Sequence, residues 1–368
     1  MTKLAVATQE QDDHRKTGAD NLLINCARLG RGTNVLFVNE SGRDAVSRET
    51  VAFIEQRARK LGANVKSIWH GPVAGPESIP EPIIKAIKDA DITIFNHTLG
   101  AMLRIRPVPG GGTGILNYAT TDDILASDWV QVPYELWQHV IKSVAGEFGH
   151  AHKWRITCPN GTDISGEVPE AERAAPATAT GFSLHTFPIG THRPTSALTA
   201  NGKIAIRWLV SSQNHDVGDG LYLDRFVIGY VKNGRFADFD GTAEDVSKVR
   251  RYLTEIGERY SQDPFIVNSW HGGINPQAFT PRRDVDDLAH WQTLVHNNPR
   301  SLHFHVIGDN VPGELSLPII DHTVVVDGDV YWDKGRFSLL NRPAAVEAAA
   351  KWDRRGRAFQ LNNQIGIR

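Results

Sequence analysis

The feature that most constrains the fold is an alternation of apolar runs with helix-periodic segments in the first third of the chain. Residues 34–39 (NVLFVN), 64–69 (NVKSIW) and 91–96 (DITIFN) have the composition of buried strands. Helical spacing fills the two intervals, over residues 43–61 and 81–90. Strand–helix–strand–helix–strand order is typical of right-handed crossovers in a parallel sheet. We therefore predict a parallel α/β domain at the N-terminus.

Beyond Lys153 the pattern changes to short β-rich runs separated by tight turns. The dipeptides Asn233-Gly234 and Asp327-Gly328 favour two-residue hairpins. One long amphipathic segment, residues 243–260, is typical of a helix. The candidate strands are residues 154–158, 203–210, 225–232, 266–270, 301–307, 323–326 and 330–332.

Two domains are expected for a chain of 368 residues. We predict an α/β domain over residues 1–150 and a β-rich α+β domain over residues 151–368. The second domain is the predicted metal-binding and catalytic domain, for reasons that follow from its histidines.

Charge and hydropathy exclude several classes of protein. The formal net charge of −2 gives no reason to expect nucleic acid or an anionic membrane as partner. No apolar run approaches the ~20 residues that a membrane-spanning helix needs, and residues 1–20 lack the apolar core of a signal peptide. Cys26 and Cys158 are too few for a disulfide framework. We expect a cytoplasmic homo-oligomer that acts on a small-molecule substrate.

Histidine is the residue type that indicates chemistry here. The chain has 15 histidines, and several of those beyond residue 190 lie on or beside predicted strands. Imidazole is a common neutral ligand for transition metals. His271 and His322 lie where a turn meets a strand, and we predict that they are metal ligands. Three further histidines of this domain are candidates to complete the metal site or to act in acid–base catalysis: His192, His303 and His305.

Carboxylates decide between one metal ion and two. A two-metal hydrolytic site needs bridging Asp or Glu residues that hold the cations about 3.5–4 Å apart. Asp327 and Asp329 flank a glycine and are more simply turn residues, while Asp321 points to the strand face opposite His322. This inventory favours a mononuclear site dominated by histidine. The carboxylates near the histidines are Asp309, Glu314, Asp321, Asp327 and Asp329.

Three neighbours of the histidines are candidate substrate contacts. Trp270 and Phe304 can supply aromatic walls for a planar substrate, although core packing is the other interpretation of both rings. Arg193 can donate hydrogen bonds from two guanidinium nitrogens to a carboxylate or phenolate oxygen of a substrate. The alternative is that Arg193 forms a surface salt bridge.

Several stretches resemble the superfamily of thermophilic-type leucyl aminopeptidases and 2,5-dihydroxypyridine 5,6-dioxygenases. They are RITCPNGTDISG (155–166), FPIGTHRPTSALTANGKIAI (187–206), HGGINP (271–276) and HFHVIGDN (303–310), and IIDHTVVVDGDVYWDKG (319–335) resembles the closing ligand segment. Order and spacing match across most of the chain, including the N-terminal domain. The resemblance implies a metalloenzyme.

The ligand positions of that superfamily are altered in this chain. The pattern has an acid after a Pro-Gly-Gly turn, a Glu or His before a Gly-x-Asn-Pro turn, and a His-x-Asp pair. Thr191 stands at the first position, and Ser269 stands at the second with His271 two residues later. His322 matches the histidine of the pair, but Val324 replaces its aspartate. A pair of cations would lack its carboxylates, whereas a mononuclear site remains feasible.

The resemblance and the residues together favour an extradiol-type, ring-cleaving dioxygenase of a hydroxylated N-heteroaromatic or related aromatic compound. Such chemistry needs open coordination positions and few protein ligands. Fe(II) is the expected metal, with Mn(II) or Zn(II) as alternatives. Two other functions stay open: a metal-dependent hydrolase of an amide, peptide or heterocycle, and a non-catalytic small-molecule binding protein that has lost its metal.

Overall fold

The computed structural model describes residues 3–42, 45–103, 107–173, 183–210, 220–308, 313–353 and 356–367. The chain forms two compact units, each assembled from segments that are distant in sequence. The first unit contains Met1–Gln138, Thr178–Ile189 and Ala348–Ala358. The second contains His139–Ala177, Gly190–Glu347 and Phe359–Arg368. The single boundary expected after residue 150 stays a prediction.

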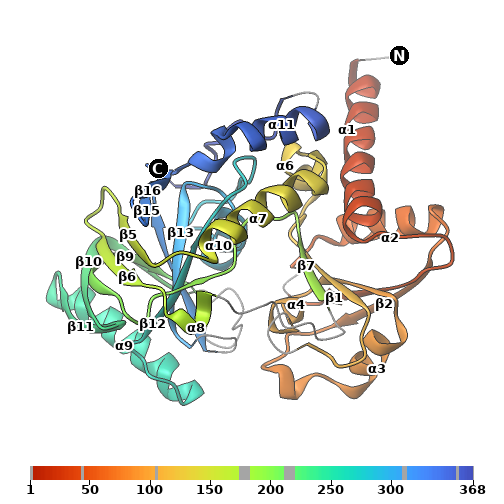
Figure 1. The fold of residues 1–368 in the computed structure, drawn as a ribbon. Helices are drawn as coiled ribbons and strands as arrows, with labels where there is room; N and C mark the ends of the chain where they lie inside the picture. Colours follow the sequence, from red (N-terminus) through yellow and green to blue (C-terminus); the bar gives the residue numbers. More distant parts are fainter. Residues whose placement is uncertain are drawn as a thin grey trace. The chain divides into compact units, whose positions relative to one another are not determined.

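The first unit is built on a sheet that includes β1, β2 and β7 in Figure 1. It has five strands in the order β2-β1-β3-β4-β7. All neighbouring strands are parallel, as predicted. The central strand β3 is buried along its whole length, which is typical of a parallel strand covered on both faces. The strands are β1 (Asn34–Glu40), β2 (Asn64–His70), β3 (Ile92–Asn96), β4 (Thr113–Asn117) and β7 (Ser183–Phe187).

Helices connect the parallel strands. α2 (Arg48–Lys60) begins at Ser47, whose side chain accepts a hydrogen bond from the backbone N–H of Thr50. It ends before Gly62, which has φ of +90°, the left-handed conformation that glycine adopts without strain. The other helices before residue 149 are α1 (Lys3–Asp20), a π-helix (Asn21–Cys26), a 3-10 turn (Pro76–Ser78), α3 (Glu81–Asp89), α4 (Leu99–Leu103), α5 (Asp122–Leu125), α6 (Asp128–Gln131) and α7 (Tyr134–Phe148).

The second unit contains two antiparallel sheets (Figure 1). The larger has the order β11-β10-β9-β6-β5-β15-β16-β17 and the smaller β14-β13-β12-β8. The larger is formed by β5 (Lys153–Thr157), β6 (Asp163–Glu167), β9 (Asn201–Leu209), β10 (Leu221–Lys232), β11 (Arg235–Asp240), β15 (Thr323–Val326), β16 (Asp329–Asp333) and β17 (Arg336–Phe337). The smaller is formed by β8 (Thr195–Ser196), β12 (Val267–Gly272), β13 (Ser301–Ile307) and β14 (Glu314–Ile320).

Both predicted hairpins are present in the larger sheet. Asn233-Gly234 and Asp327-Gly328 have positive φ at both positions, as a two-residue hairpin turn requires. These turns connect β10 to β11 and β15 to β16. The mixed fold of parallel and antiparallel sheets is therefore confirmed. The remaining helical elements are α8 (Glu170–Arg173), α9 (Ala243–Tyr260), α10 (Leu288–Val295), a 3-10 turn (Ser338–Asn341) and α11 (Pro343–Trp352).

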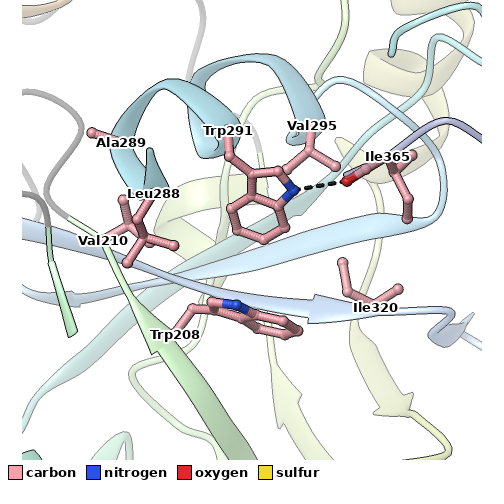
Figure 2. Packing of buried hydrophobic residues seen from close by; sticks show 8 residues of the cluster. All are labelled: Trp208, Val210, Leu288, Ala289, Trp291, Val295, Ile320 and Ile365. Carbon is pink, nitrogen blue, oxygen red and sulfur yellow. Dashed lines mark hydrogen bonds between the residues drawn. The ribbon is translucent and has the colours of Figure 1, made fainter. Parts of the chain in front are cut away.

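A buried cluster joins β9 to α10 in the second unit (Figure 2). The ring centroids of Trp208 and Trp291 lie 5.4 Å apart. The indole nitrogen of Trp291 donates to the carbonyl of Ile365 over 2.7 Å, and that of Trp208 donates to Asp284 over 3.1 Å. Both indole N–H groups are thus satisfied, so the rings can be buried without the cost of an unpaired donor. The cluster consists of Trp208, Val210, Leu288, Ala289, Trp291, Val295, Ile320 and Ile365.

Within the part of the chain that the structure describes, no helix is both long and apolar enough to cross a bilayer.

Candidate metal centre

Three buried histidines converge in the second unit. The candidate ligand atoms of His271, His303 and His305 all lie within 4.8 Å of one another. Nε2 of His303 is the central atom, 2.7 Å from Nε2 of His271 and 3.2 Å from Nε2 of His305. Three nitrogen atoms directed at one small volume form a donor set that suits a divalent transition metal.

The pairing of β12 with β13 brings these side chains together. His271 lies opposite His303 across the two strands, and Ser269 lies opposite His305. Because residues two apart on a strand share a face, His303 and His305 project to the same side as His271. The alternation in His303-Phe304-His305 therefore places two imidazoles on one face of β13.

Hydrogen bonds fix the outer nitrogen atoms of two of these rings. Nδ1–H of His271 donates to the backbone carbonyl of His192 over 2.9 Å, which leaves the lone pair of Nε2 directed at His303. Nδ1 of His305 lies 3.0 Å from the hydroxyl of Ser269. Histidine ligands usually donate their second N–H to a carbonyl or similar acceptor, which fixes the tautomer and the ring orientation. The donor set fits a metal in this respect as well.

The electrostatic environment keeps the imidazole of His271 neutral. Burial lowers its pKa well below 6.5, and the neighbouring His303 and His305 lower it further. Neutral imidazole is the form that binds a metal.

Among the described residues, the Glu314 carboxylate lies beside the imidazoles. Oε1 of Glu314 is 3.3 Å from Nε2 of His305, and the Glu314 side chain is only 11% exposed. Glu314 is the first residue of β14 and pairs with Ile307 at the end of β13. It is one of the carboxylates noted from the sequence, whereas Asp309 lies outside the described residues.

Two of the other candidate carboxylates, Asp321 and Asp327, have structural partners. Asp321 forms two hydrogen bonds with the guanidinium of Arg300, over 2.7 and 2.8 Å. Asp327 accepts hydrogen bonds from the backbone N–H groups of His152 and Lys153, which agrees with its interpretation as a turn residue.

Neither a family model nor a curated protein sequence matches the chain. Among solved structures it is similar to the 2,5-dihydroxypyridine dioxygenase of Pseudomonas putida KT2440, with a TM-score of 0.61 and 15% identity over 88% of this chain and 96% of that chain. The chain has the fold of that dioxygenase.

A second similar structure is wild-type AmpT from Thermus thermophilus, with a TM-score of 0.52 and 11% identity over 88% of this chain and 99% of that chain. The resemblance drawn from the sequence is therefore confirmed at the level of the fold. Identities this low leave the activity to be argued from the residues of the site.

His192 is buried next to the three histidines, but both of its ring nitrogens are already engaged. Nδ1 donates to the carbonyl of Arg193 over 2.6 Å, and Nε2 accepts from the backbone N–H of Gly272 over 3.1 Å. Burial lowers its pKa to about 4. Its backbone carbonyl, rather than its imidazole, contacts His271. The neighbouring Arg193 is exposed.

His322, the histidine matched to the superfamily pattern, lies outside the group of three. It is fully buried, and its ring centroid is 6.0 Å from that of Trp332. Neither of its ring nitrogens has a hydrogen-bond partner among the described residues, and burial lowers its pKa to about 3. Val324, at the position of the missing aspartate, is also fully buried.

Trp270 and Phe304 lie opposite each other on β12 and β13, and both are fully buried. They alternate with the three histidines along these strands, so their side chains project from the other face of the sheet. Trp270 packs against Trp154, with ring centroids 5.6 Å apart. The structure therefore places both rings in the core and away from the three imidazoles.

Proposed function

We propose that the chain is a mononuclear metalloenzyme whose metal is held by His271, His303 and His305. The single observation that carries this proposal is the convergence of three Nε2 atoms in a buried site. It retains His271 from the sequence-based ligand pair and replaces His322 with the His-x-His pair of β13. Fe(II) is the proposed metal, with Mn(II) or Zn(II) as alternatives.

We further propose ring cleavage of a small hydroxylated N-heteroaromatic or related aromatic compound by O2. The fold shared with a 2,5-dihydroxypyridine dioxygenase supports this proposal, as does a donor set that leaves several coordination positions open. A bound iron would supply Lewis acidity and one-electron chemistry with O2.

The chain's own residues orient the donors and handle protons. The His192 carbonyl holds the His271 ring in one tautomer, and the Ser269 hydroxyl has the same role at His305. Glu314 is placed to accept the proton that a ring hydroxyl releases, since its carboxylate lies within 3.3 Å of a donor imidazole. Burial of the site limits competing water.

A metal-dependent hydrolase is the alternative, because a single carboxylate beside a metal can also act as the base that activates water. The observation that favours it is the position of Glu314 beside His305. A two-metal mechanism has less support, since Asp321 and Asp327 are held by other partners.

The decisive experiment combines elemental analysis with reconstitution by Fe(II), Mn(II) and Zn(II). We expect about one metal ion per chain and, with 2,5-dihydroxypyridine as the probe substrate, consumption of O2. Turnover of an amide or of the same ring that persists without O2 would select the hydrolase. A folded protein that binds none of the three metals would refute the metalloenzyme and leave a non-catalytic binding protein. Light scattering tests the proposed homo-oligomer.

A further inference from the structure

A pocket in the second unit is lined by none of the three histidines of the proposed metal centre. Its volume is about 470 Å³, within the ~300–1,000 Å³ typical of small-molecule sites. Trp208 and Ile320 line it and also belong to the buried cluster, so one wall is part of a packed core (Figure 2). Its lining includes Arg207, Tyr222, Phe226, Arg283, Asp284 and Val285.

Arg207 combines a positive charge with aromatic neighbours in this pocket. Its guanidinium carbon is 5.3 Å from the ring centroid of Tyr222 and 5.5 Å from those of Trp208 and Phe226. One terminal nitrogen donates to the Tyr222 hydroxyl over 2.7 Å. Nε is buried and has no hydrogen-bond partner among the described residues. Because the Tyr222 hydroxyl takes only one of the five N–H groups, the terminal nitrogens of this guanidinium retain donor capacity for an anion.

The charged side chains that line the pocket have a small positive excess. Arg300 and Asp321 neutralise each other through two hydrogen bonds. Asp284 contributes one negative charge against the positive charges of Arg207 and Arg283. Within the described ranges of the chain, neither of these two arginines has a carboxylate at ion-pair distance. The described lining residues thus carry an excess of about one positive charge, which a monoanion would neutralise and a dianion would exceed.

We infer that this pocket is a second ligand site, which binds an aromatic carboxylate. Arg207 and Arg283 would meet the carboxylate, since the planar guanidinium matches its two oxygens. Tyr222 and Phe226 are partly exposed and would cover the face of the ring. The site is independent of the metal centre, because it shares no lining residue with the three histidines.

The test is calorimetric titration of the full chain with 2-naphthoate, beside 2-naphthamide and inorganic phosphate as probes. We expect naphthoate to bind, and Arg207→Gln to weaken binding about tenfold or more, because hydrogen bonds to charged groups are the strong ones. Val285→Trp should block the pocket without disturbing the core, since Val285 is 46% exposed. This second variant keeps the test valid if Arg207→Gln fails to fold.

Arg251→Gln is the matched control, because it removes one exposed charge of the same unit on α9 and should leave the affinity unchanged. His303→Ala should also bind naphthoate normally, which separates this site from the proposed metal centre. The inference is overturned if naphthoate does not bind, if both pocket variants bind it normally, or if His303→Ala abolishes binding. Tighter binding of phosphate, or equal binding of the neutral amide, overturns the assigned ligand class.

Discussion

Replacement of His303 by alanine is the sharpest perturbation of the proposed metal centre. Nε2 of His303 is the central atom, at 2.7 and 3.2 Å from the other two Nε2 atoms. His303→Ala therefore leaves two imidazoles and removes the atom that connects them. Loss of a partner that only orients a ligand typically lowers metal affinity about 10–100-fold. Loss of a ligand itself should lower the metal affinity by more than the upper end of this range. We therefore expect the affinity to fall more than about 100-fold, which corresponds to more than about 2.7 kcal/mol of binding free energy.

A graded series makes that magnitude testable. Ser269→Ala removes only the hydroxyl 3.0 Å from Nδ1 of His305 and should weaken metal binding by about 10–100-fold. His290→Ala alters a histidine of α10 outside the group of three and should have no effect. Affinity for Zn(II) or Mn(II), measured by competition with a chelator, gives the order without any assay of turnover. Equal metal affinity for His303→Ala and His290→Ala, with both proteins folded, would refute the three-histidine centre.

Two further predictions concern Glu314 and His322. Glu314→Gln should lower turnover about 100-fold or more while leaving the protein folded, because general acid–base groups contribute about 10²–10⁴-fold to the rate. Steady-state kinetics of the reconstituted enzyme measure this effect. Unchanged turnover would exclude Glu314 as the proton acceptor. The pKa of His322 is lowered from 6.5 to about 3, so below pH 6.5 the unfolded chain binds a proton at this site that the folded chain does not. The free energy of unfolding should therefore fall as the pH decreases from about 6.5 towards 3, by up to about 1.4 kcal/mol per pH unit from this group. Urea unfolding of His322→Leu should show a correspondingly shallower decrease, and an identical pH slope in both proteins would contradict the prediction.

Local sequence patterns were sufficient to predict more than half of the strands and both hairpin turns. The runs at residues 301–307 and 323–326 coincide with β13 and β15, because apolar alternation and the Asp327-Gly328 turn are short-range signals. The strands that were not predicted are β4, β6, β7, β8, β11, β14 and β17. Of these, β14 has the sequence ELSLPII, which contains Pro318, and a proline argues against a central strand. β14 lies at the edge of its sheet, where a strand tolerates proline.

The candidate site depends on strand pairings that local sequence patterns do not indicate. The spacing of His303 and His305 indicates a shared face, and both residues are site candidates from the sequence alone. Their proximity to His271 follows from the register of β12 against β13, which is set by packing over the whole sheet. The same limit applies to β7, which pairs with β4 in the sheet of the first unit although it lies beyond residue 151.

The tryptophan pair of the buried cluster gives the second unit an optical signature. Two indole rings 5.4 Å apart and inclined by 33° absorb near-ultraviolet light as a coupled pair, whose dichroism depends on their mutual orientation. Trp208 also lines the arginine-containing pocket, so an aromatic molecule placed there would perturb the transition of that indole. The protein thus contains its own chromophore for following both the integrity of its interior and the occupancy of the pocket, without an attached label.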